Sequence, residues 1–146
     1  MSELNTTRLE SEWVTLQNQY DSYEKYSLVI KLINVLFCGV LLFALHAGLW
    51  TAVIMVILWL QDGIWKTFQN RIGQRLEVIE QALLQEQQNQ KSESPVEGMQ
   101  FNLAWAQSRP NAIGLVTEYV TQSCKPTIAY PHLLLIVLVG LYYFWG

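Results

Sequence analysis

Apolar residues are concentrated in three long stretches of the chain, and polar sequence surrounds each of them. The first stretch is interrupted only by Lys31 and Asn34, and the second has no charge before Asp62. A helix needs about 20 residues to cross a hydrocarbon core of about 30 Å, and each stretch approaches or reaches that length. The pattern therefore predicts transmembrane helices over residues 27–45, 49–65 and 127–146, with a short external turn over residues 46–48.

The polar sequence on both sides of the first two stretches repeats apolar residues at helical spacing. Steps of three and four residues connect the apolar and aromatic positions within residues 1–26 and again within residues 66–90. A three-residue turn makes the first two membrane helices antiparallel, so these two stripes lie at matching distances from the turn. We therefore expect an all-α membrane protein in which the first two helices form one long hairpin, extending about 30 Å into the cytoplasm as a stalk.

Two interpretations of the stalk stripes remain open: they pack on each other, or they also form the subunit contact of an oligomer. Residues 91–126 are expected to form a linker with short amphipathic helices, because polar and Pro/Gly positions precede the pieces "FNLAWAQ" and "NAIGLVTEYVTQ". In the second piece Ile113, Val116 and Val120 share a face, with Tyr119 beside them. This face either lies in the lipid headgroup region or packs on the stalk.

Charge sets the predicted orientation. The chain has 51% hydrophobic and 14% charged residues, and its basic residues fall before the first apolar stretch, within it, or between the second and third. By the positive-inside rule the N-terminus and the long middle segment are cytoplasmic, and the chain ends outside. The net charge of −3 argues against general nucleic-acid binding.

Two charged residues in the predicted spans are candidates for an ion pair. Lys31 and Asp62 lie equally far from the turn, which places them at the same depth, and a pair would lower the cost of both charges. Alternatively, Lys31 extends to the headgroups while Asp62 is hydrated. Asp62 is also four residues before Lys66, a helical spacing that permits an ion pair.

Other polar residues supply further candidates. Asn34 is suited to a hydrogen bond between membrane helices. His132 opens the third span, where it either gates or relays protons or serves as a hydrogen-bonded structural residue. Lys66, Arg71 and Arg75 form a basic band that would meet anionic headgroups or, alternatively, a phosphate-bearing ligand.

No catalytic motif, metal-binding pattern or cofactor motif is recognisable, so we expect neither enzymatic activity nor a cofactor. The segments "WLQDGIWKTFQNRIGQRLEVIE" and "KPTIAYPHLLL" resemble small bacterial three-span inner-membrane proteins of uncharacterised type. The resemblance implies a bacterial inner membrane. Some proteins of this size and build are oligomeric effectors of stress or phage-defence systems, which is the function class that it suggests.

Three functional hypotheses follow. In the first, the chain self-associates into a homo-oligomeric channel or membrane-perturbing effector with the stalk as its sensing region, because three spans cannot enclose a pore alone. In the second, it is a membrane-anchored adaptor whose cytoplasmic helices recruit a soluble protein. The third, a transporter or membrane enzyme, lacks the expected broken helices and intramembrane acids.

Overall fold

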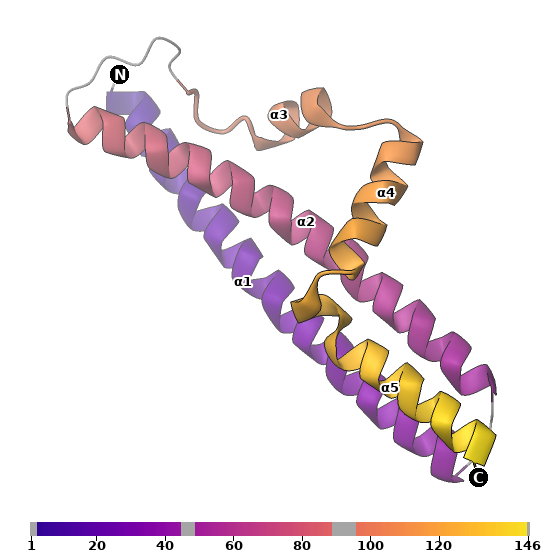
Figure 1. Ribbon diagram of the computed structural model, residues 1–146. Helices are drawn as coiled ribbons and strands as arrows, with labels where there is room; N and C mark the ends of the chain where they lie inside the picture. Colours follow the sequence, from indigo (N-terminus) through magenta and orange to yellow (C-terminus); the bar gives the residue numbers. More distant parts are fainter. Residues whose placement is uncertain (1–2, 45–48, 89–95, 146) are drawn as a thin grey trace.

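The computed structural model describes residues 3–44, 49–88 and 96–145, and within them the chain is all-helical. The external turn predicted over residues 46–48 lies outside this part of the chain. Figure 1 shows two long helices side by side, with the remaining helices arranged along them. In chain order the elements are α1 (Glu3–Gly39), the π-helical turn η1 (Val40–Ala44), α2 (Leu49–Gln87), α3 (Phe101–Ser108), α4 (Ala112–Ser123) and α5 (Pro126–Trp145).

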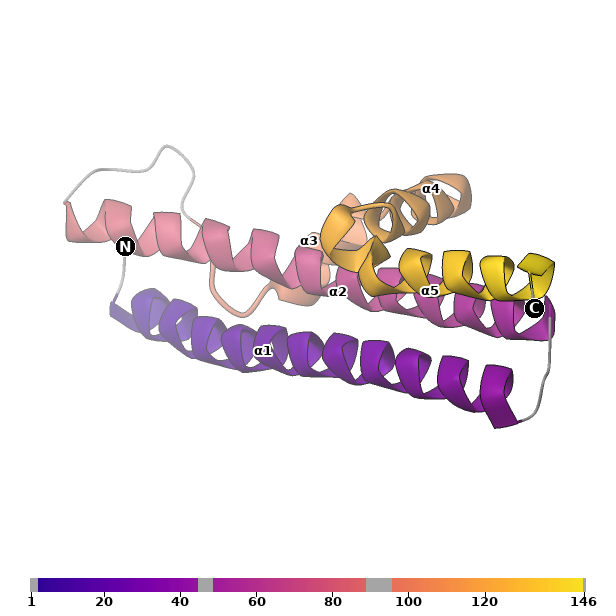
Figure 2. The ribbon, with the colours of Figure 1, turned by 60° about the horizontal axis from the view of Figure 1, so that its bottom comes forward.

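The prediction of an all-helical chain with three helices able to span a membrane is confirmed. The first (α1 with η1), α2 and α5 are each long and apolar enough to cross a bilayer. With 37 and 39 residues, α1 and α2 each extend more than about 50 Å, well beyond a hydrocarbon core of about 30 Å. Figure 2 shows them running alongside one another over this length, with α5 beside α2 at one end.

The hairpin thus has two halves of different composition. We call residues 27–44 and 49–65 together with α5 the apolar half, and residues 3–26, 66–88 and 96–123 the polar half. In the polar half the two stripes recognised in the sequence pack into a single cluster with Trp13, Tyr20 and Tyr23 at its edge. Its buried members are Leu9, Leu16, Ile72, Leu76, Ile79 and Ala82.

The apolar half is a three-helix bundle, in which α5 packs on both α1 and α2. Its buried apolar cluster comprises Cys38, Leu42, Met55, Leu135 and Val139, and Ile128 of α5 is buried as well. The backbone of α5 is non-helical at Tyr130, so the long continuous part of this helix begins at Pro131. This is where proline is tolerated, because the first turn of a helix has no internal acceptor for its missing N–H group.

Helix α4 packs on α2, but not through the face that carries Ile113, Val116 and Val120, so the interpretation in which this face packs on the stalk is wrong. Ser123 and Gln122 are buried at this contact, and the Trp59 indole donates a hydrogen bond to the Ser123 carbonyl at 2.9 Å. A Cβ atom on Gly63 would lie 1.8 Å from Ser123 Oγ, so glycine at this position permits the close approach of the two helices. The apolar stripe of α4 therefore faces outward.

Candidate functional site

The apolar half contains a buried polar network centred on Asp62 of α2. The Ser27 hydroxyl of α1 donates to Asp62 Oδ1 at 2.5 Å, and the His132 ring of α5 lies 3.3 Å from Asp62 Oδ2 through Nε2. Lys31 Nζ is 3.6 Å from Asp62 Oδ2 and donates to the Thr127 carbonyl at 3.3 Å. The Asp62 carboxylate of α2 therefore receives contacts from both other helices of the bundle, α1 and α5.

Asn34 extends the network to the far side of His132. Its amide Nδ2 hydrogen-bonds to His132 Nδ1, which joins α1 directly to α5. The two ring nitrogens of His132 thus face different partners, Nδ1 the Asn34 amide and Nε2 the Asp62 carboxylate.

Burial distinguishes this network from a surface ion pair. Ser27, Asn34, Asp62 and His132 are fully buried, whereas the Lys31 side chain is 19% exposed. Lys31 and Asp62 carry opposite charges, and their pairing lowers the cost of holding either charge away from water. The network can thus hold α1, α2 and α5 in one relative rotation and depth.

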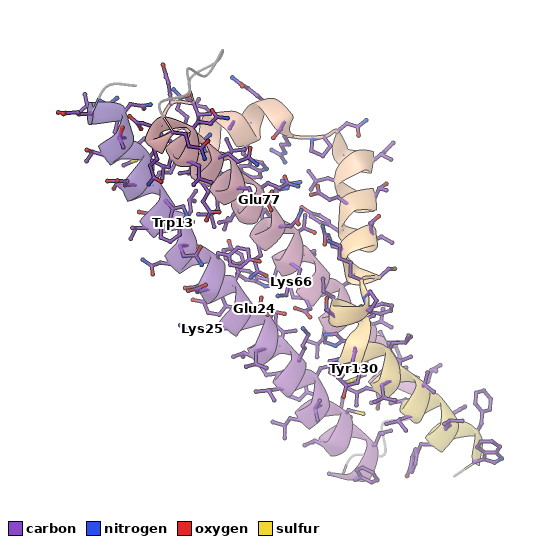
Figure 3. The ribbon with its side chains drawn as sticks, turned by 60° about the vertical axis from the view of Figure 1, so that its left-hand side comes forward. Trp13, Glu24, Lys25, Lys66, Glu77 and Tyr130 are labelled. Atoms are coloured by element: carbon purple, nitrogen blue, oxygen red, sulfur yellow. The ribbon has the colours of Figure 1, made fainter. Side chains whose placement is uncertain are left out.

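Lys66 contacts α1 rather than Asp62, the alternative partner four residues earlier. Its Nζ atom is 2.5 Å from Glu24 Oε2 and 2.8 Å from Gln69 Oε1. Figure 3 shows Lys66 and Glu24 in the space between α1 and α2, whereas Lys25 points away from the hairpin. The hydrogen bonds donated by Lys66 and Gln69 hold the pKa of the Glu24 carboxyl below its ordinary value of 4.5.

Glu24 is therefore expected to make folding pH-dependent. A carboxyl with a lowered folded-state pKa adds stability above its unfolded pKa, and this contribution is lost as the pH falls through the folded pKa. Between about pH 6 and pH 3, Glu24→Gln should flatten the decline of the thermal midpoint in detergent. The exposed Glu77 provides the control, since Glu77→Gln should keep the wild-type slope. Identical slopes for Glu24→Gln and wild type would contradict this role.

Arg71 and Arg75, the other members of the predicted basic band, are each paired with an acid. Arg71 Nη2 is 2.5 Å from Glu118 of α4, and Arg75 Nε is 2.9 Å from the buried Glu12 of α1. Together with the Lys66–Glu24 pair, these contacts neutralise the band, contrary to the expectation of a free basic surface for headgroups. The acids come from distant parts of the chain, which the local spacing of basic residues does not reveal.

A cavity of about 430 Å³ lies beside these arginines, between α2, α3 and α4. Its walls include Arg71, Arg75, Phe101, Trp105 and Glu118. Arg71 Cζ lies 5.5 Å from the centre of the Trp105 ring, close enough for a cation–π contact. Arg71 and Arg75, which the sequence placed in a band on one helix, thus also line a cavity that α3 and α4 complete.

Sequence reasoning missed Ser27, Glu12 and Glu118 as site residues. Ser27 lies four residues before Lys31, a helical spacing that places both on one face and that could have indicated its role. Glu12 stands within the apolar stripe of α1, between Leu9 and Trp13, and an acid in such a stripe is a signal of a buried partner. No comparable signal identifies Glu118.

Within residues 3–44, 49–88 and 96–145, no group of three His, Cys, Asp or Glu side chains is arranged to hold a metal ion. Comparisons of the chain with protein-family models, with curated proteins and with solved structures gave no match.

Proposed function

We propose that this chain is a membrane-anchored adaptor, with the apolar half as its anchor and the polar half presented to a soluble protein. We further propose a bacterial inner membrane, with the N-terminus and the polar half in the cytoplasm and the C-terminus outside. The distribution of basic residues supports this orientation. One observation carries the proposal. Polar side chains point inward in the apolar half, whereas apolar side chains on α4 point outward in the polar half.

In the apolar half, polar side chains face inward. Ser27, Asn34, Thr51, Asp62 and His132 are all buried in the three-helix bundle. Its outward side chains are largely apolar, as lipid contact requires, and a water-filled pore between copies would lack a polar lining from these residues. This arrangement favours an anchor over a conducting assembly.

In the polar half, by contrast, apolar side chains face outward on α4. Ile113, Val116 and Val120 are 78%, 59% and 49% exposed and share one face of the helix. The helix is capped by the Asn111 side chain, which accepts a hydrogen bond from the Gly114 amide at 2.9 Å. A capped helix with an uncovered apolar stripe suits recognition of an apolar groove on a soluble protein.

The experiment places a photoreactive amino acid at Val116 in the full chain and activates it in intact cells. The adaptor hypothesis predicts an adduct whose added mass is not a multiple of the 16.9 kDa chain. The same reagent at the exposed Glu10 of α1, away from the stripe, is the control and should give much less of this adduct. An adduct with lipid alone would place the stripe in the headgroup region and contradict the proposal.

The second candidate is the homo-oligomeric channel or membrane-perturbing effector, the class that the resemblance connects to stress and phage defence. The observation in its favour is an apolar groove of about 650 Å³ between α1, η1 and α5, lined by residues that include Val35, Leu42, Leu138 and Leu141. Native mass spectrometry in nanodiscs separates the two candidates. A defined homo-oligomer with ion conductance would favour the effector, and a monomer without conductance would favour the adaptor.

A further inference from the structure

The cavity between α2, α3 and α4 combines apolar walls with unused hydrogen-bond donors. The apolar residues in its lining are Val78, Phe101, Ala104, Trp105 and Pro110. Its volume of about 430 Å³ falls within the range of about 300–1,000 Å³ that is typical of small-molecule sites. The cavity is therefore large enough for a compact organic molecule.

Two of the residues that line this cavity have buried N–H groups without a partner among the described residues. These atoms are Nη1 of Arg71 and Nε1 of Trp105. The Arg71 side chain is 10% exposed, and its other terminal nitrogen is occupied by Glu118. Buried donors ordinarily find an acceptor, because leaving them unpaired carries the full cost of their desolvation.

The electrostatics around the cavity favour a single negative charge. Arg71 is paired with Glu118 and Arg75 with Glu12. Arg109 lies with Cζ 5.9 Å from the centre of the Trp105 ring and has no ion pair within the described ranges. Arg109 thus adds an uncompensated positive charge next to the cavity, and the Trp105 ring in its wall presents a flat surface to a ligand.

We propose that this cavity binds a small organic monoanion, a flat and largely apolar molecule with one carboxylate or phosphodiester group. The anionic oxygens accept from Arg71 and Trp105, and the apolar body lies against Phe101 and Pro110. This binding site goes beyond the adaptor function and does not require it. Carboxylates and phosphates share the recognition chemistry, and the source that we propose is a soluble molecule rather than a lipid headgroup.

The test uses the full chain in phosphatidylcholine nanodiscs and follows the indole N–H resonance of Trp105 by NMR. Indole-3-acetate is the probe, and indole-3-acetamide is its uncharged match. We expect indole-3-acetate to shift the Trp105 resonance saturably and the amide to bind at least about tenfold more weakly, as expected when a charged hydrogen bond is lost. Equal binding of acid and amide would overturn the proposal.

Two variants with opposite expected effects test the role of Arg71. Arg71→Gln should weaken indole-3-acetate binding at least about tenfold. Glu118→Gln removes the competing carboxylate and should tighten binding several-fold, because the Arg71 charge is then free for the ligand. Lys25→Gln, on an exposed position of α1, is the control and should leave affinity unchanged.

If Arg71→Gln does not fold, Glu118→Gln still tests the site, because its expected effect is tighter rather than weaker binding of indole-3-acetate. Unchanged or weaker binding by Glu118→Gln would overturn the site. A final arm replaces phosphatidylcholine with phosphatidylglycerol in the nanodiscs, first without indole-3-acetate and then with it. If the lipid alone shifts the Trp105 resonance and blocks indole-3-acetate, the soluble-ligand proposal is wrong.

Discussion

Replacing Asp62 with alanine should destabilise the apolar half by about 3–5 kcal/mol, the usual cost of removing one partner from a buried ion pair. Asp62 accepts contacts from Ser27, Lys31 and His132, and it is fully buried. Its removal leaves the Lys31 charge and two hydrogen-bond donors without their acceptor. The expected result is a large fall in the thermal midpoint in detergent, together with loosening of α5.

A second substitution separates loss of the pair from simple loss of packing. Lys31→Leu in the Asp62→Ala background removes the stranded cation, so the double variant should be more stable than Asp62→Ala alone. Glu77→Ala, at an exposed position of α2, should change stability by no more than about 0.5 kcal/mol. Glu86→Ala would be a poorer control than Glu77→Ala, because Glu86 accepts a hydrogen bond from Thr6. Equal stability of the single and double variants would show that loss of the Lys31–Asp62 pair does not cause the destabilisation of Asp62→Ala.

Glu12→Ala should have an effect of similar size, about 3–5 kcal/mol, in the polar half. Glu12 is 4% exposed and receives two hydrogen bonds from the Arg75 guanidinium, at 2.9 and 3.1 Å. It also accepts from the Met99 amide at 2.5 Å, which ties the segment before α3 to α1. The substitution therefore leaves the Arg75 charge without its carboxylate partner, with only the Glu97 carbonyl still accepting from it, and releases the segment before α3 from α1.

Hydrogen exchange of the Met99 amide is the most direct measurement, because this group loses its acceptor. Exchange should be much faster in Glu12→Ala than in wild type, and the unfolding midpoint should fall. Glu10→Ala is the matched control, since Glu10 is exposed and lies two residues earlier on the same helix. Unchanged Met99 exchange in Glu12→Ala would show that Glu12 does not hold this segment.

Much of the architecture could be predicted from local sequence. The three apolar stretches and the stripes at helical spacing determined the long hairpin and the antiparallel match of its helices, because these features depend on periodicity and length. The equal distances of Lys31 and Asp62 from the turn likewise determined their common depth. Depth follows from counting residues along a regular helix with a rise of 1.5 Å per residue.

Counting residues along a helix gives depth but not the rotation of the helix about its axis, which the tertiary structure decided. Rotation about each helix axis places Ser27 and His132 on Asp62, turns Lys66 toward Glu24, and directs Ile113, Val116 and Val120 outward. The partners of Arg71 and Arg75 lie 47 and 63 residues away in sequence. Such contacts arise from the packing of helices that are distant in the chain, and no local spacing encodes which residues meet. The sequence by itself therefore determined the hairpin and its depth, while packing decided the polar network, the neutralised arginines and the cavity beside Trp105.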